Sequence, residues 1–177
     1  MRIISGTHKG RQIVAPKNLP VRPTTDFAKE GLFNILANHF DMKYLSVLDL
    51  FAGTGNITYE FASRGCKEIT AIDINYKCVQ SMKQTITALG FQNINIIKKD
   101  AFKYLTGCNI SYDIIFADPP YELANVDLVA ELVFKKQLLN KEGWLVIEHK
   151  KERDFSEHKY LIRQKKYGNV NFSIFKA

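Results

Sequence analysis

The sequence has little of what marks a membrane protein, a metalloprotein or a disulfide-stapled protein. Its apolar runs stay well short of the ~20 residues that a helix needs to span a bilayer. The 3 cysteines are scattered and the 4 histidines fall on unrelated segments, so neither set has metal-ligand spacing. We therefore expect no metal site and no membrane span, and we interpret Cys66, Cys78 and Cys108 as buried or incidental thiols.

Targeting signals are scarce as well. Residues 1–6 lack the apolar region and cleavage site of a signal peptide, and an odd number of thiols suits the reducing cytosol. We therefore expect a cytoplasmic protein. A chain of 177 residues, 46% of them hydrophobic, is long enough for one domain with a substantial core, and we expect a monomer.

Acidic residues are missing from the N-terminal segment. Residues 1–24 contain several basic residues and no acid, while the net charge of the whole chain is +7. A solvated basic face is the ordinary explanation of such a run. We prefer contact with a polyanion such as RNA, because the charge is uncompensated and lies among turn glycines. The candidate RNA-binding residues are Arg2, Lys9, Arg11 and Arg22.

Short apolar runs alternate with helical periods after residue 25 and predict a doubly wound α/β domain. Residues 47–51 and 114–116 are apolar almost throughout, which is typical of parallel strands covered by helices on both faces. The fold class is thus a mostly parallel, Rossmann-like sheet. We expect strands over residues 46–51, 68–72, 95–98, 112–117 and 144–148, and helices over residues 56–64, 76–89 and 126–139.

Further elements are expected at the two ends. Residues 160–163 and 171–175 predict an antiparallel C-terminal hairpin, and residues 2–5 and 12–15 predict an N-terminal hairpin that adds little to the sheet. We therefore divide the chain into a basic hairpin with an extended arm, residues 1–24, and the α/β domain, residues 25–177. Thr25 or Asp26 caps a first helix, whose apolar positions are Phe27, Ala28, Leu32, Phe33, Ile35 and Leu36.

A glycine turn follows the first expected strand, in the sequence Asp49-Leu50-Phe51-Ala52-Gly53-Thr54-Gly55-Asn56. Gly53 and Gly55 would let the backbone turn tightly and approach a ligand without a Cβ in the way. A dinucleotide fingerprint would have a third glycine where this chain has Thr58. The turn therefore favours S-adenosylmethionine over a ligand with a pyrophosphate.

Acidic residues end three successive strands beside this turn. Asp49 ends the first strand, Asp73 ends the second and suits ribose hydroxyls, and Asp100 follows the third and suits an adenine amine. Each could instead be a helix cap or a solvated strand end, and for Asp100 this alternative is equally good. The candidate cofactor-binding residues are Thr25, Asp49, Phe51, Gly53, Gly55, Asp73, Ile74, Asp100 and Ala101.

The tetrapeptide Asp118-Pro119-Pro120-Tyr121, the candidate catalytic motif, directly follows the expected strand 112–117. The Tyr121 ring could stack on a flipped base, while the Asp118 carboxylate and the Pro119 carbonyl accept both protons of an exocyclic amine. The amine lone pair would then face an electrophilic methyl. The same tetrapeptide is also an ordinary strand-exit turn. We expect Asp118 to orient the amine without a raised pKa, because the cationic product loses its proton easily.

These segments, in this order and spacing, resemble the RsmD-type methyltransferases, which act on guanine N2 of small-subunit ribosomal RNA. The resemblance rests on residues 22–36, 49–55 and 118–121 and on an N-terminal element that binds RNA in that family. It implies methyl transfer from S-adenosylmethionine to one guanine of 16S ribosomal RNA, in the small subunit or an assembly intermediate. Lys9, Phe27 and Lys29 depart from the family pattern, so contacts there are not carried over.

Three other functions stay open. An adenine-N6 methyltransferase of DNA or RNA would use the same tetrapeptide, because the adenine amine presents the same two protons. A dehydrogenase would bind a nicotinamide dinucleotide at the glycine turn, which the missing third glycine disfavours. A noncatalytic RNA-binding protein on the same scaffold would not need Asp49, Asp73 and Asp118, yet all three are present.

Overall fold

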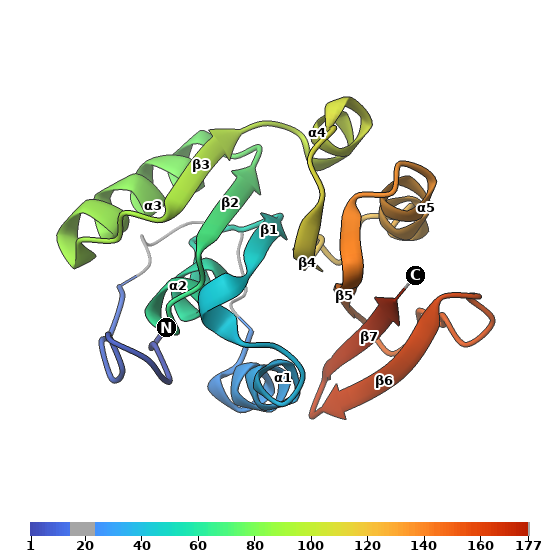
Figure 1. Cartoon of the computed structure of the whole chain (residues 1–177), viewed down its shortest axis with the longest axis horizontal. Helices are drawn as coiled ribbons and strands as arrows, with labels where there is room; N and C mark the ends of the chain where they lie inside the picture. The colour runs from blue at the N-terminus through green and yellow to red at the C-terminus, as the bar shows by residue number, and fades with distance from the viewer. Residues whose placement is uncertain (15–23, 177) are drawn as a thin grey trace.

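The computed structural model describes residues 1–14 and 24–176, and its strands form one sheet in the order β3-β2-β1-β4-β5-β7-β6 (Figure 1). The first five strands in the chain are parallel, and β7 pairs antiparallel with both β5 and β6. The predicted doubly wound sheet with a C-terminal antiparallel hairpin is confirmed. The strands are β1 (Ser46–Leu50), β2 (Glu68–Asp73), β3 (Ile94–Lys98), β4 (Tyr112–Ala117), β5 (Leu139–His149), β6 (Leu161–Tyr167) and β7 (Val170–Lys176).

Helices cover both faces of this sheet and enclose two apolar cores. One core joins the sheet to α1 (Asp26–Ala37), α2 (Asn56–Ser63) and α3 (Tyr76–Leu89). The other joins it to α4 (Ala101–Gly107) and α5 (Asp127–Lys135). All residues of β1 are buried, as expected of a central parallel strand. The chain adds β2 and β3 on one side of β1 and adds β4 and β5 on the other side. This topological switch point between β1 and β4 opens a crevice at the carboxyl ends of the two strands.

Several boundaries differ from those expected. Helix α4 and a 3₁₀ turn at Met42–Tyr44 were not predicted, because elements of seven residues or fewer show too little of a period. Helix α5 ends at Lys135 and β5 begins at Leu139, where the sequence pattern continued the helix. The left-handed backbone of Gln137 (φ 54°) separates the two elements. Phe27, expected on the apolar face of α1, is 67% exposed.

The N-terminal segment is more firmly built into the fold than expected. Its two arms pair at a single antiparallel bridge, Arg2 with Gln12, and are too short to count as strands. Ile3 and Ile13 nevertheless belong to the core under α1 and α2. The described part of this segment adds no strand to the sheet, as expected, but its side chains contribute to the core. Ala15 and Arg22, to which the expected hairpin and arm extend, lie outside the described residues.

A buried carboxylate ties this segment to the helices. Glu60 of α2 is fully buried and accepts hydrogen bonds from the backbone amides of Ile4 (2.8 Å) and Ser5 (3.1 Å). Its oxygens also pair with Arg64 Nε at 2.8 Å and Lys29 Nζ at 3.5 Å. Such a carboxylate is stable only while its partners are in place, because an unpaired buried charge is costly. Residues 1–5 thus complete the interior of the protein.

Lys29 has a structural role of this kind. Its side chain is buried, and Nζ donates to the Arg2 carbonyl (2.5 Å) and to Asn56 Oδ1 (3.0 Å). Burial lowers the pKa of Lys29, although Glu60 and Asp26 act against that effect. The departure from the family pattern at this position therefore lies in the interior rather than on an RNA-facing surface.

Gly6 and Gly10 allow a matched test of how closely the segment packs. Both have φ of 83°, but a Cβ on Gly6 would lie 1.8 Å from the Ser63 carbonyl oxygen, whereas at Gly10 no described atom lies within 4 Å. We expect Gly10→Ala to lower the free energy of unfolding by about 1–2 kcal/mol through strain alone. Gly6→Ala should add a packing cost of about 1–3 kcal/mol. Urea unfolding measures both variants, and equal losses would show that the contact at Ser63 yields easily.

Candidate active site

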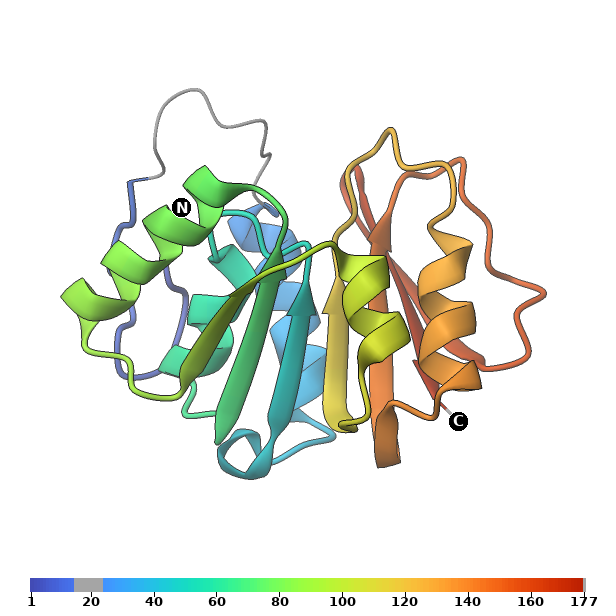
Figure 2. The same cartoon turned by 90° about the horizontal axis from the view of Figure 1, so that it is seen from above.

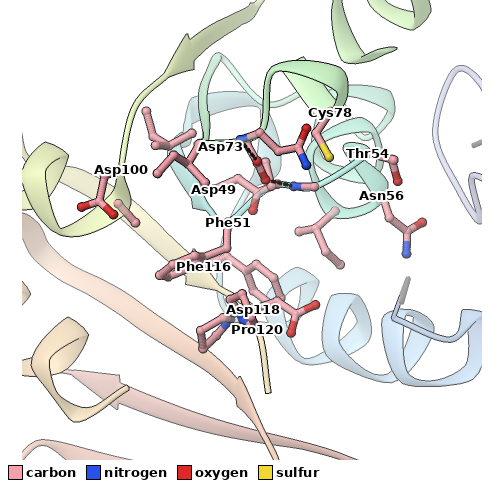
Figure 3. Close-up of a pocket in the computed structure, with 18 of the residues that line it drawn as sticks. Asp49, Phe51, Thr54, Asn56, Asp73, Cys78, Asp100, Phe116, Asp118 and Pro120 are labelled. Carbon is pink, nitrogen blue, oxygen red and sulfur yellow. Dashed lines mark hydrogen bonds between the residues drawn. The ribbon is translucent and has the colours of Figure 1, made fainter. Parts of the chain in front are cut away.

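A cavity of about 550 Å³ opens at the carboxyl ends of the parallel strands, where the strand order reverses (Figure 3). It collects residues from four connections that are distant in the sequence: the glycine turn, the β2–α3 turn, the start of α4 and the exit of β4. Predicted site residues that line it are Asp49, Phe51, Gly53, Asp73, Ile74, Asp100, Ala101, Asp118, Pro119, Pro120 and Tyr121. The topology therefore brings the cofactor candidates and the tetrapeptide together.

The glycine turn adopts an unusual backbone. Gly53 and Gly55 have φ of 57° and 87°, and Phe51 has φ of 60° although it is a bulky residue. A side chain in that region costs on the order of 1–3 kcal/mol and persists only where the surroundings impose it. Here the Ala52 amide donates to the Ile72 carbonyl at 2.9 Å and holds the turn against β2. Gly55 lies behind the cavity lining, where a Cβ would meet the Tyr59 ring at 2.5 Å.

Asp73 fixes the same turn through hydrogen bonds to both of its oxygens. Oδ2 accepts from the Gly53 amide at 2.7 Å, and Oδ1 accepts from the Asn75 amide at 2.7 Å (Figure 3). Burial raises the pKa of Asp73, although these two bonds oppose the effect. A carboxylate has about four acceptor sites, so both oxygens keep capacity for ligand hydroxyls. Asp73 can therefore shape the turn and bind a ligand at the same time.

Asp49 is the most deeply buried acid of the cavity, at 1% exposure. Its Oδ2 accepts a hydrogen bond from Thr58 Oγ1 at 2.5 Å. Burial and the charge of Asp73 together raise the pKa of Asp49 to about 7, and the hydrogen bond from the Thr58 hydroxyl opposes this shift. Thr58, which stands where a dinucleotide fingerprint has its third glycine, is thus the hydrogen-bond partner of Asp49.

Asp100 is a helix cap that also faces the cavity. Its Oδ1 accepts from the Lys103 amide at 2.9 Å and begins α4, which is the alternative that the sequence left open. Ala101 and Phe51 lie nearby in the lining, and the Phe51 ring contacts Phe102 edge-on at 6.1 Å. A carboxylate beside small and aromatic apolar groups can receive an adenine ring and its amine.

The tetrapeptide lies across the cavity from the glycine turn (Figure 3). Burial, together with the charges of Glu148 and Asp49, raises the pKa of Asp118 well above its usual range. The expectation of an unshifted pKa was therefore wrong, because it left out the burial of Asp118 and the neighbouring carboxylates. The Tyr121 ring has Lys150 Nζ at 4.8 Å from its centroid, a cation–π contact that orders the ring at the cavity mouth.

Glu148 is a site residue that the sequence reasoning missed. Ala117 of β4 pairs with Ile147 of β5, so the next residues, Asp118 and Glu148, extend side by side from neighbouring strands. Glu148 is 3% exposed and its Oε2 accepts from Thr24 Oγ1 at 2.8 Å. The available signal was the acid that ends the expected strand 144–148, the same signal that identified Asp49 and Asp73.

Thr25 lies outside the large cavity. It caps α1 by accepting from the Ala28 amide at 3.2 Å, as predicted for the helix start. Thr25 instead lines a second cavity of about 150 Å³, whose lining also includes Phe27, Tyr121, Glu148 and Tyr167. Tyr121 belongs to both cavities. Thr24 rather than Thr25 reaches the larger one.

The exposed basic residues Lys9 and Arg11 are distant from this site, whereas Arg2 lies nearer to it, at the start of α1. Residues 7–10 pack on the C-terminal ends of α2 and α3, where the Thr7 amide donates to the Ser63 carbonyl at 2.7 Å. Helices that connect parallel strands run antiparallel to those strands, so the C-terminal ends of α2 and α3 lie where the strands begin. The tip therefore lies at the end of the sheet opposite to the cavity. Lys9 and Arg11 are exposed there, whereas Arg2 pairs with Asp26 at 3.1 Å. Figure 2 shows the segment at the far side of the molecule from β6 and β7.

Residues 1–14 and 24–176 contain neither a metal-binding cluster nor a membrane-spanning helix. These residues contain no group of three or more His, Cys, Asp or Glu side chains that could hold a metal ion. Within the same described residues, no helix is both long and apolar enough to cross a membrane. The three cysteines are buried free thiols.

Similarity to known proteins identifies this chain as a methyltransferase of the Rossmann-like class. The structure of the putative methyltransferase yhhF from Escherichia coli superposes with a TM-score of 0.86 at 25% identity, covering 99% of this chain and 96% of that one. The chain belongs to the family described as conserved hypothetical protein 95, whose model matches residues 1–176.

Two curated relatives are similar over most of their length. The putative rRNA methyltransferase YlbH of Bacillus subtilis is 32% identical, over 99% of this chain and 98% of the relative. The ribosomal RNA small subunit methyltransferase D of Escherichia coli is also 32% identical, over 84% of this chain and 71% of the relative. The membership suggested by the sequence motifs is confirmed.

The buried Asp49 predicts a pH-dependent stability of the ligand-free protein. Its pKa is about 7 when folded and about 3.9 when unfolded, so the folded state binds more protons between these values. Stability should therefore fall as pH rises from about 4 to 7, by at most about 4 kcal/mol from this group. Asp49→Asn should remove that part of the slope. Urea unfolding at pH 5 and pH 8 measures it, and an unchanged difference between the two pH values would contradict the assignment.

Proposed function

We propose that this protein transfers a methyl group from S-adenosylmethionine to the exocyclic N2 amine of one guanine in 16S ribosomal RNA. The substrate would be the small ribosomal subunit or its assembly intermediate, in the cytoplasm, and the enzyme would act as a monomer. The observation that carries the proposal is that Asp118 and Tyr121 line the same cavity as the glycine turn. The names of the curated relatives support the ribosomal substrate.

The residues of the cavity fit the cofactor. Asp73 would hold the ribose hydroxyls, Asp100 and Ala101 would receive the adenine, and the backbone at Gly53 would lie against the amino acid part. Bound S-adenosylmethionine would supply an electrophilic methyl group. Ala52 and Thr54 complete the cradle, in a turn that Asp73 already holds in shape.

The protein itself mainly positions the acceptor. The Asp118 carboxylate and the Pro119 carbonyl are acceptors only, and together they can hold both protons of the guanine amine. Tyr121 would stack on the flipped base. The amine lone pair would then point into the cavity, and correct alignment can contribute roughly 7 kcal/mol or more. Asp118 must be ionised to do this, so its raised pKa bears directly on activity.

RNA would also be held away from the site. Lys9 and Arg11 are exposed on the N-terminal tip, and Arg2 is partly engaged by Asp26. We assign them, with Arg22, to phosphate contacts that fix the register of the RNA without reading its sequence. Because the tip is on the opposite edge of the sheet from the cavity, the RNA would contact the protein at two separate places.

The decisive experiment is methyl transfer from labelled cofactor to small subunits purified from cells that lack the gene. Nucleoside analysis should yield N2-methylguanosine in 16S ribosomal RNA. N6-methyladenosine would instead identify the adenine alternative, and absence of transfer with intact RNA binding would identify a noncatalytic protein. Titration with a reduced nicotinamide dinucleotide tests the dehydrogenase alternative separately.

Asp73→Ala should weaken S-adenosylmethionine binding by about 1–3 kcal/mol, because charged hydrogen bonds to the ribose are lost. Isothermal calorimetry measures this. Asp41→Ala is a matched control, since Asp41 makes the same type of turn bond, to the Lys43 amide at 3.3 Å, in an exposed turn. Unchanged cofactor affinity of the Asp73 variant would remove this residue from the binding site.

Asp118→Asn should lower the methyl-transfer rate by about 100-fold or more with little change in cofactor affinity, because the variant loses a charged acceptor. The wild-type rate should rise as the pH rises through the raised pKa of Asp118, and this rise should be absent from the pH–rate profile of the variant. Glu122→Gln is the control, since Glu122 is exposed and lines the same cavity. A variant with the wild-type rate would show that Asp118 does not contact the amine.

A further inference from the structure

The smaller cavity shares Tyr121 with the cofactor cavity and has the character of a base pocket. Its volume of about 150 Å³ is well below that of sites for drug-sized ligands, which begin near 300 Å³. It therefore suits a single planar group. Three of its lining residues are the aromatic side chains of Phe27, Tyr121 and Tyr167, and a flipped base is held in this way between aromatic groups.

The aromatic wall of this cavity is built by close packing. Tyr167 lies over α1 at a position where Gly31 has no side chain, and a Cβ there would meet the ring at 2.2 Å. Phe27 contacts the Tyr167 ring edge-on at 5.6 Å. This contact explains why Phe27 projects outward from α1 instead of facing the core.

Glu148 is the charged residue in the lining of this cavity, which also includes the polar residues Thr25 and Asn169. The β4–β5 register places Glu148 beside Asp118, and the charge of Glu148 acts on the Asp118 carboxyl. Two carboxylates therefore stand next to one another, one in each cavity, with Tyr121 reaching both. Thr24 Oγ1 donates to Glu148 Oε2 at 2.8 Å and helps to fix the orientation of the carboxylate.

Neighbouring acceptors distinguish the two purines. On the Watson–Crick edge of guanine, the N2 amine is next to N1–H, so two adjacent groups are donors. In adenine the amine is next to an unprotonated N1, which is an acceptor and would face a carboxylate without a proton between them. Asp118 and the Pro119 carbonyl can bind either amine, but Glu148 complements only guanine.

We propose that Glu148 determines the specificity for guanine, its carboxylate accepting N1–H while Asp118 and the Pro119 carbonyl accept the amine protons. The inference rests on the proposed function, because it places the target base in the smaller cavity beside Tyr121. The N1 lone pair of adenine would face the Glu148 carboxylate and be repelled by it, so discrimination against adenine is expected.

The test uses two ribonucleotides that share the N2 amine. Guanosine 5′-monophosphate presents N1–H, whereas 2,6-diaminopurine riboside 5′-monophosphate presents an acceptor at N1. Affinity is measured by ligand-observed NMR competition on the full chain saturated with S-adenosylhomocysteine. We expect the wild type to bind the guanine nucleotide at least ~10-fold more tightly, which corresponds to the 1–3 kcal/mol of a well-placed base contact.

Glu148→Gln should reduce or invert this ratio, because an amide can donate to an unprotonated N1. Glu152→Gln is the matched control, since Glu152 is an exposed residue of the following turn and the exchange is chemically the same. The control should keep the wild-type ratio. A Glu148→Gln variant that folds and keeps the wild-type ratio would overturn the proposal, as would a wild type without preference.

The readouts separate this inference from the proposed function. Nucleotide binding does not require methyl transfer, so a wild type that prefers the guanine nucleotide but modifies no ribosomal RNA would refute the function alone. A wild type that forms N2-methylguanosine, with a Glu148→Gln variant of unchanged nucleotide ratio, would refute the inference alone. If Glu148 acted only through Asp118, its replacement would shift the pH–rate profile and leave the base preference unchanged.

Discussion

A chain of hydrogen bonds that begins at the buried Glu60 carboxylate links the N-terminal segment to the active site. Glu60 pairs with Lys29, Lys29 Nζ donates to Asn56 Oδ1, and Asn56 Nδ2 donates to the Thr24 carbonyl at 2.9 Å. Thr24 Oγ1 then donates to Glu148. The first residues of the chain, the first two helices and the base side of the cavity therefore depend on one another. A buried network of this kind is stable only when every member has its partners.

This dependence gives a physical reason for the position of the N-terminal segment in the family fold. The amides of Ile4 and Ser5 satisfy Glu60, and the Arg2 carbonyl satisfies Lys29. A segment that presents basic side chains to solvent on one side thus uses its backbone to complete the interior on the other. Its sequence shows the charge, whereas its backbone contacts depend on a helix more than fifty residues away.

Much of the fold and part of the site could be predicted from sequence, because they follow from local patterns. Apolar runs in the sequence predict the strands that end near Asp49, Asp73 and Asp118, and closely spaced glycines predict the turn. The role of Lys29 could not be assigned in this way, and the strand-end position of Glu148 marks it as a candidate without showing its partners. These partners are brought close by strand register and helix packing. The raised pKa of Asp118 likewise comes from burial and from the charges of Glu148 and Asp49, which only the fold brings together.

The left-handed Phe51 has a consequence for attempts to stabilise this enzyme. Its backbone stores strain in the very turn that lines the cavity, and glycine would adopt the same conformation without that strain. Selection for thermal stability alone could therefore favour replacement at this position, at the expense of the aromatic group beside Asp100. The strained turn is a point where evolution toward robustness and evolution toward catalysis select different residues.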